Sequence, residues 1–359
     1  MRTLEEIRQA LAGYNGRPLK IMEVCGTHTS AIIKGGIREM LSPKIRLVSG
    51  PGCPVCVTSP YYMDEACSYA LKPDHVLVTF SDMMKVPGLK GNLYDARASG
   101  GRIEMVYSPL TILDRAAKNP DTTYVMAAVG FETTAPVYAI LLDEAEKRGI
   151  GNIRLLTAIK TILPAMESIL ESEEIDGFIC PGHVSAIIGA RAYEPLAARF
   201  DKPFVIAGFD AENLLAAIYE IVRWAKAEAG EVKNLYTSIV SPDGNGKAKL
   251  LLDKYFMPCD CYWRGLGAIP ASGLKLRPEY ERFDVKWTDK EAAEAASQNT
   301  MGCRCGDVIK GRINPDQCPL FGGVCTPQNP FGACMVSQEG ACGVWFSNMI
   351  RKKGGGYEN

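Results

Sequence analysis

The stretch YVMAAVGF, residues 124–131, is an unbroken apolar run that is followed at once by the polar residues ETT, 132–134. It is far shorter than the roughly 18 apolar residues that a membrane span needs, and it fits a strand buried on both faces. Similar runs alternate with helical patterns along the chain, at residues 21–24, 45–48, 76–80, 105–107, 153–157, 177–180 and 204–207. This alternation predicts an α/β fold built on parallel sheets.

Two changes of pattern divide the chain. The segment from Pro109 to Pro120 separates two series of strands, so we place a boundary near residue 118. Beyond residue 236 glycine-punctuated segments lead into a turn-rich tail that buries little apolar area, and a bound metal would have to supply its folding free energy. We predict two parallel-sheet βαβ domains, residues 1–118 and 119–236, and a cysteine-rich C-terminal domain, residues 237–359.

Composition narrows the class of protein. Lys plus Arg number 40 and Asp plus Glu 41, so the net charge of −1 gives no pull toward nucleic acid or an anionic membrane. The first 16 residues lack the apolar core of a signal peptide, and we expect a cytoplasmic protein. Thirteen cysteines against three histidines then indicate thiol redox chemistry or metal binding by sulfur.

Candidate site residues follow the predicted strands, where α/β proteins bind ligands. Cys53 and Cys56 form a C-x-x-C motif at a turn that we expect to lead into a helix, whose N–H groups would lower a thiol pKa. Half of a structural zinc site is the alternative. Cys25 and His28 have the spacing of a nucleophile and its base, but the sequence identifies no residue to orient them.

The tail holds six cysteines in the pattern C-x-C-x12-C-x6-C-x8-C-x7-C, namely Cys303, Cys305, Cys318, Cys325, Cys334 and Cys342. Four thiolates make an iron–sulfur or a zinc site. The remaining two suit electron exchange between a cluster and a disulfide, although zinc with two unused thiols is the alternative. Spacing does not decide between Cys303 and Cys305, or between Cys334 and Cys342, as ligands.

Several long motifs occur together and in order: CGTHT (25–29), GPGCPVC (50–56), SDMMKVPG (81–88), GFETTAP (130–136), CPGHVS (180–185), WRGLGAIPASGL (263–274) and CTPQNPFGACMVSQEGAC (325–342). Over nearly its whole length the chain thereby resembles the HypD family of [NiFe]-hydrogenase maturation factors. The resemblance implies a [4Fe-4S] cluster in an iron–sulfur domain at residues 237–359. It also implies a scaffold, shared with the chaperone HypC, on which the Fe(CN)2(CO) unit is assembled.

By the same resemblance, cyanide comes from a thiocyanate on HypE, and the finished unit passes toward the hydrogenase large subunit. Thiolates hold such soft iron well, so we expect Cys25 to bind it with a HypC cysteine, while His28 acts as proton donor or hydrogen-bond partner. The Cys53/Cys56 dithiol would supply two electrons. The family pattern implies the following further residues: cluster ligands Cys303, Cys318, Cys325 and Cys342, the redox pair Cys305 and Cys334, and second candidates Glu132, His183 and Glu339.

Three hypotheses therefore compete. An assembly scaffold with redox activity is favoured over a free-standing enzyme. A general cluster-dependent thiol–disulfide oxidoreductase would act on unrelated disulfides and would not need Cys25. A purely structural zinc tail would serve partner docking. Cys259 and Cys261 lie outside the family pattern, so any role of this pair would be particular to this chain.

Overall fold

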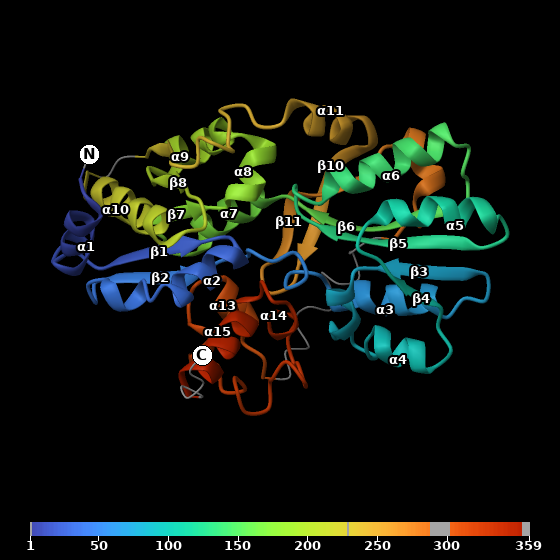
Figure 1. Ribbon diagram of the computed structural model, residues 1–359, viewed down its shortest axis with the longest axis horizontal. Coiled ribbons are helices and arrows are strands. Elements are labelled where there is room, and N and C mark those ends of the chain that lie inside the picture. The colour runs from blue at the N-terminus through green and yellow to red at the C-terminus, as the bar shows by residue number, and fades with distance from the viewer. Residues whose placement is uncertain (1, 228–229, 288–301, 354–359) are drawn as a thin grey trace, which may run out of the picture.

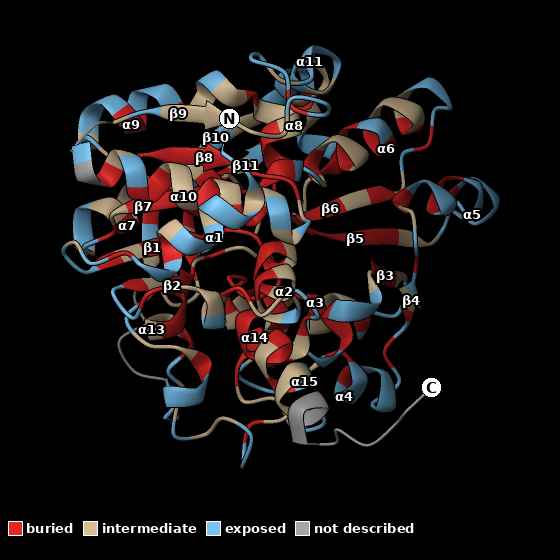
Figure 2. Cartoon of the chain, turned by 60° about the vertical axis from the view of Figure 1, so that its left-hand side comes forward, coloured by how far each residue is buried: buried red, intermediate tan, exposed pale blue. Residues whose placement is uncertain are grey.

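The computed structural model describes residues 2–227, 230–287 and 302–353. Two sheets lie side by side, with helices covering their faces and the C-terminal helices packed below the first sheet (Figure 1). Buried residues concentrate in the strands and on the inner faces of the helices, while the outer faces of the helices are exposed (Figure 2). No described helix has the length and apolar character needed to cross a membrane.

The first sheet has the order β2-β1-β7-β8-β9, and its pairs are all parallel. Its strands are β1 (Leu19–Glu23), β2 (Ile45–Ser49), β7 (Gly177–Cys180), β8 (Phe204–Ile206) and β9 (Val232–Asn234). The first four coincide closely with predicted apolar runs. Burial of these four strands on both faces explains why they read as continuous apolar sequence.

The second sheet has the order β10-β11-β6-β5-β3-β4. Four of its strands pair in parallel, namely β3 (His75–Thr79), β4 (Ile103–Met105), β5 (Thr123–Gly130) and β6 (Ile153–Lys160). Parallel pairing was predicted, but the run predicted at 105–107 begins and ends two residues later than β4. An antiparallel hairpin, β10 (Phe256–Trp263) and β11 (Gly267–Leu276), pairs with the edge of β6.

This hairpin corrects the expectation that regular structure stops beyond residue 236. Gly265 and Gly267 had indicated a break, but both have positive φ and form the tight connection between β10 and β11. The mixed second sheet therefore replaces the expected purely parallel one. Helix α11 (Gly246–Tyr255) precedes the hairpin and packs on α6 (Ala135–Lys147).

Strand pairing follows a division different from the predicted one, because each sheet takes strands from both sides of residue 118. The first sheet contains β1, β2 and β7–β9, and the second contains β3–β6, β10 and β11. The bounds 1–118, 119–236 and 237–359 stay a prediction. A mixed α/β fold with parallel sheets and a cysteine-rich C-terminal region is confirmed.

The remaining helices cover the sheets and connect the strands. Thr3 and Glu6 form the predicted capping box at the start of α1. The other elements are α1 (Leu4–Ala12), α2 (Gly26–Lys34), α3 (Pro60–Ala70), α4 (Leu93–Ala98), α5 (Ile112–Lys118), α7 (Ile162–Ser172), α8 (Gly182–Ile188), α9 (Glu194–Phe200), α10 (Ala211–Ala227), α13 (Cys305–Ile309), α14 (Ala333–Val336) and α15 (Ala341–Lys353), with 3-10 helices at Arg38–Met40, Ser81–Lys85, Pro109–Thr111, Ala190–Tyr193, Pro278–Phe283 and Pro315–Gln317. The C-terminal segment docks on the first sheet, because α15 packs on α2 and α13 packs on β2.

Candidate functional site

The loops after β1 and β2 touch backbone to backbone at the carboxyl edge of the first sheet. A Cβ at Gly52 would lie 2.5 Å from the nitrogen and 2.7 Å from the Cα of Cys25, so only glycine fits there. This contact sets the CGTHT motif directly against the GPGCPVC motif. The sequence-based expectation that residues after neighbouring parallel strands converge is confirmed for these two loops.

Cys25 lies between the end of β1 and the first turn of α2, and it is buried. Burial raises the pKa of its thiol to about 11, although the N–H groups of Thr27 and His28 at the start of the helix favour the thiolate. At neutral pH this sulfur therefore keeps its proton. A soft metal ion that binds it would displace that proton, because thiolate is the metal-binding form.

Glu23 is a buried acid beneath Cys25 that the sequence analysis did not single out. One carboxylate oxygen accepts the N–H of Cys25 at 3.0 Å, and the other accepts the hydroxyl of Thr29. Burial raises the pKa of Glu23 to about 7, against the lowering effect of these hydrogen bonds. The available signal was an acid within the run at residues 21–24, whose other residues are apolar. Its contacts fix the backbone that carries Cys25.

His28 turns its ring toward the loop after β8. Its Nε2 lies 3.3 Å from the carbonyl oxygen of Ala207 and 3.1 Å from that of Gly208. Burial lowers the pKa of His28 to about 4, so the ring is neutral at physiological pH. Of the two predicted roles, this geometry favours the hydrogen-bond partner over an imidazolium proton donor. The ring of Phe209 lies 5.1 Å from His28 and 4.4 Å from His183, and it links the two histidines.

Glu339 brings the C-terminal segment to the same place. A Cβ at Gly26 would lie 2.1 Å from the carbonyl oxygen of Glu339, so the loop that carries this acid rests on the residue next to Cys25. Desolvation, together with the charge of Asp82, raises the pKa of the Glu339 carboxyl, while His183 lowers it. His183, Asp82 and Glu339 are thus electrostatic neighbours, although they belong to three distant motifs.

Glu132 follows β5 on the side of the second sheet. Its Oε1 accepts the N–H of Ile162 at 2.8 Å, whereas its buried Oε2 has no hydrogen-bond partner within the described part of the chain. Burial raises the pKa of Glu132 to about 7. Cys25 and Glu132 both act electrostatically on the buried Tyr193, so the carboxyl ends of the two sheets face a common region.

Cys53 and Cys56 are both buried in the turn that precedes α3. The expectation that a helix N-terminus lowers a thiol pKa here is wrong for Cys56, because burial and the neighbouring thiols of Cys334 and Cys53 raise its pKa well above the usual value. Helix α3 begins only at Pro60, and the side chain of Ser59 caps its first turn. Burial and the sulfurs beside it therefore both disfavour a thiolate at Cys56.

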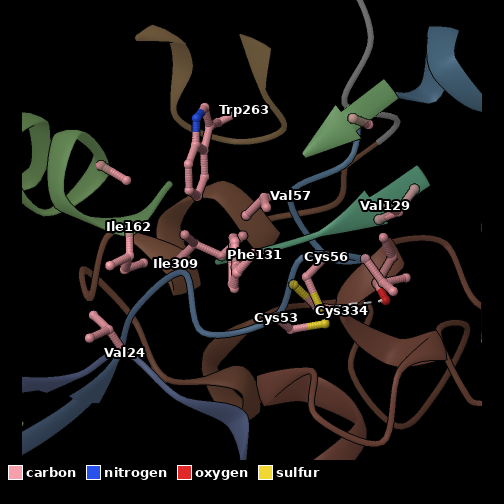
Figure 3. Close-up of a cluster of buried hydrophobic side chains, with 14 of the residues drawn as sticks. Val24, Cys53, Cys56, Val57, Val129, Phe131, Ile162, Trp263, Ile309 and Cys334 are labelled. Atoms are coloured by element: carbon pink, nitrogen blue, oxygen red, sulfur yellow. Dashed lines mark hydrogen bonds between the residues drawn. The ribbon is translucent and has the colours of Figure 1, made fainter. Parts of the chain in front are cut away.

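A row of thiols extends from the C-x-x-C motif into the tail. Cys56 interacts with Cys53 on one side and with Cys334 on the other, and Cys334 in turn interacts with Cys305. Figure 3 shows Cys53, Cys56 and Cys334 together at the edge of the hydrophobic core. The thiols of Cys305 and Cys56 lower the pKa of Cys334 to about 7, so it forms a thiolate more readily than Cys56 or Cys305, whose pKa values are raised. Cys303 continues the row beyond Cys305.

The six tail cysteines line one cavity of about 310 Å³, counting its open mouth, with apolar walls that include Leu320 and Phe321. No three His, Cys, Asp or Glu side chains of the described residues are gathered closely enough to hold a single metal ion. Cysteine thiolates are the ligands of iron–sulfur clusters, and the six cysteines around this cavity provide more than the four that such a cluster needs. The donor set therefore fits the expected cluster.

Cys25 at a strand end, the row of thiols beside it and the ring of tail cysteines bring cysteines of several distant motifs together in one part of an α/β fold. Sequence comparison identifies the family. Residues 1–349 match the HypD family model, which is described as "Hydrogenase formation hypA family". The chain belongs to the HypD family of hydrogenase maturation factors, as the motifs predicted.

Curated proteins of this family are similar to the chain over most of its length and over most of their own length. The chain is 40% identical over 352 residues to "Hydrogenase maturation factor HypD" of Escherichia coli (strain K12), covering 96% of this chain and 94% of the relative. It is 42% identical over 336 residues to "Hydrogenase maturation factor HypD2" of Bradyrhizobium diazoefficiens, covering 91% and 88%. For "Hydrogenase maturation factor HypD" of Azotobacter vinelandii the identity is 39% over 340 residues, covering 92% and 89%.

Proposed function

We propose that this protein, together with a HypC-type chaperone, is the scaffold on which the Fe(CN)2(CO) unit of a [NiFe] hydrogenase is assembled. The observation that carries this proposal is the position of Cys25. This protonated, buried thiol lies against the loop that holds the Cys53/Cys56 dithiol and beneath the C-terminal segment that brings Cys334 to Cys56. A metal-binding sulfur and a source of electrons thus meet in one region.

Cys25 is the residue that we propose for the iron, which is the cargo of the scaffold. Ferrous iron with cyanide and carbonyl ligands is soft and prefers thiolate, and a cysteine of the chaperone would be the second protein ligand. Glu23 holds the backbone of Cys25, and the neutral His28 is fixed close by at the carbonyls of Ala207 and Gly208. A docked partner completes this site, because Cys25 alone provides one sulfur.

Cyanide transfer from a thiocyanate on HypE requires two electrons, and the Cys53/Cys56 dithiol provides them. The two thiols become a disulfide, the S–C bond of the thiocyanate breaks, and the products are a HypE thiol and cyanide for the iron, with the two thiol protons taken up by these products. Burial and neighbouring thiols keep Cys56 protonated until the row of sulfurs exchanges a proton. The completed unit then moves toward the hydrogenase large subunit.

The cavity of the tail would hold a [4Fe-4S] cluster through Cys303, Cys318, Cys325 and Cys342, and the bound cluster would supply single electrons. Cys305 and Cys334 are the proposed redox pair beside it. Cys334 is suited to this task because it interacts with both Cys305 and Cys56 and has a pKa of about 7. It can therefore reduce a Cys53–Cys56 disulfide by thiol–disulfide exchange without a rearrangement of the domains.

The test is infrared spectroscopy between about 1900 and 2150 wavenumbers, where CN and CO stretches of a soft iron site are expected, on protein purified without oxygen together with its chaperone. Bands that are present in the wild type and in Cys67→Ala but lost in Cys25→Ala would support the scaffold. Cys67 is a matched control because it is a partly buried cysteine on α3. A reduced chain that turns over unrelated disulfides and shows no bands would instead establish a general thiol–disulfide oxidoreductase.

A further inference from the structure

Cys259 and Cys261 form a second pair of thiols, on strand β10 and apart from the row described above. Their sulfurs each lie 3.2 Å from the position that a Cβ of residue 273 would occupy. Residue 273 is glycine, so the two sulfurs share the space that any other side chain would fill. The irregular pairing of β10 with β11 between these cysteines allows both to occupy one place.

Lys160 reaches the same place from the neighbouring strand. It pairs with Gly273 in the register of β6 and β11, and Gly273 pairs with Cys259 across β11 and β10. Its Nζ lies 3.0 Å from the sulfur of Cys261 and 2.8 Å from the carbonyl oxygen of Tyr262. Three adjacent strands thus bring one lysine and two cysteines together.

Lys160 donates a hydrogen bond to the sulfur of Cys261, and this contact bears on the state of that thiol. Lys160 is fully buried, and no carboxylate of the described residues lies within ion-pair distance of it. The carbonyl of Tyr262 and the ring of Trp263, whose centroid lies 5.6 Å from Nζ, stabilise a buried ammonium only in part, and a thiolate would compensate its charge further. Lys160 Nζ donates to the sulfur of Cys261 at 3.0 Å and to the carbonyl oxygen of Tyr262 at 2.8 Å, so its charge lies directly beside this sulfur. The arrangement therefore favours a thiolate on Cys261.

Cys259 is the second thiol of the pair, and it keeps its proton at neutral pH. It is more exposed than Cys261, and burial followed by the charge of Cys261 raises its pKa to about 11, although Lys275 and Lys160 act in the opposite direction. One thiolate beside one thiol is the arrangement of a dithiol ready for exchange with a disulfide.

We propose that Cys259 and Cys261 are a second redox couple, in which Cys261, held as a thiolate by Lys160, attacks low-molecular-weight disulfides. The sulfur of Cys261 bonds to one sulfur of the small disulfide and releases the other as a thiolate. Cys259 then attacks this mixed disulfide and releases the second small thiol. The protein gives up two electrons and gains the Cys259–Cys261 bond, and the proton of Lys160, which has lost its counter-ion, passes to the released thiolate.

The experiment exposes the reduced full-length protein to oxidised glutathione at pH 7 without oxygen and identifies the products by peptide mass spectrometry. We expect a Cys259–Cys261 disulfide in the wild type and a glutathione adduct on Cys261 in Cys259→Ser. Iodoacetamide should alkylate Cys261 at least tenfold faster than Cys67, whose pKa burial raises to about 11. Lys160→Met should remove this difference, and Lys160→Arg, which keeps the positive charge, should largely preserve it.

The wild-type measurements decide the proposal even if a variant does not fold. Alkylation of Cys261 that is no faster than that of Cys67 would overturn it, and so would glutathione mixed disulfides at Cys259 that never resolve onto Cys261. Loss of reactivity in both Lys160→Met and Lys160→Arg would show that Lys160 acts through packing rather than through its charge. Infrared bands at the iron site test the proposed function separately, because Cys259 and Cys261 take no part in it.

Discussion

Gly26→Ala should detach the C-terminal segment from the loop of Cys25. The new Cβ would lie 2.1 Å from the carbonyl oxygen of Glu339, and it would need 3.4 Å for ordinary contact, so one backbone must retreat by 1.3 Å. Helix α2 cannot yield, because Gly26, Thr29 and Ile32 are buried in it. The loop of Glu339 must therefore move, together with the contact between Cys56 and the Cys334 segment.

Two opposing contributions determine how much Gly26→Ala changes the free energy of unfolding. Alanine is favoured over glycine in a helix by about 1 kcal/mol. Overpacking costs about 1–3 kcal/mol. The new Cβ would clash with the backbone carbonyl of Glu339, which cannot rotate away as a side chain can, so we expect a cost at the upper end of that range. We expect a net loss of about 2 kcal/mol in the free energy of unfolding, which at a slope of about 3 kcal/mol per molar urea lowers the midpoint by roughly 0.7 M.

Urea unfolding followed by circular dichroism measures this shift, with Gly151→Ala as the control because its Cβ would meet no atom within 4 Å. A second readout is the rate at which iodoacetamide alkylates Cys25, which should rise as the Glu339 loop moves away. If the two variants unfold at the same midpoint and alkylate alike, the close approach of Gly26 to Glu339 does not hold the C-terminal segment in place.

Three further predictions follow from buried groups. Between pH 4.5 and about 7 Glu132 ionises in the unfolded chain but stays protonated in the folded protein, so the free energy of unfolding falls as the pH rises. Glu132→Gln should remove up to about 3 kcal/mol of this pH-dependent loss of stability. The measurement is a plot of unfolding free energy against pH, which should be flatter for the variant. Trp263→Ala, which empties a fully buried site stacked on Phe131, should cost about 3–5 kcal/mol by the same urea measurement. Cys318→Ser should lower the iron and acid-labile sulfide bound per chain, and unchanged contents relative to Cys67→Ser would remove Cys318 from the proposed ligands.

Much of the fold was predictable because strands that are buried on both faces must be continuously apolar. The runs at 21–24 and 124–131 identified β1 and β5 to within about two residues, which is the usual uncertainty of element ends. The β10–β11 hairpin was missed because Cys259, Asp260 and Gly273 interrupt its alternation, and its irregular pairing leaves no regular period to read. Strand pairing between distant segments has no local signal at all.

Site residues could be predicted where a chemically reactive residue type directly follows a predicted strand. Cysteines that directly follow strands, such as Cys25 and Cys53, were found because the fold class places them at one edge. Glu23 and Lys160 were missed because each is the last residue of its strand, where a single charged residue is easily taken for an exposed position. Their burial depends on neighbours from other parts of the chain, which the sequence does not show.

The interleaved strand order has a consequence for how the protein is made. The chain enters the first sheet, leaves it for β3–β6, returns for β7–β9 and leaves again for the hairpin. During synthesis the first sheet stays incomplete until Asn234 has emerged, and the second until Leu276 has. Contacts of such long sequence separation form late and slowly. The nascent chain therefore exposes unpaired strand edges and reactive thiols through most of its translation, which makes early protection of these segments a requirement of its biogenesis.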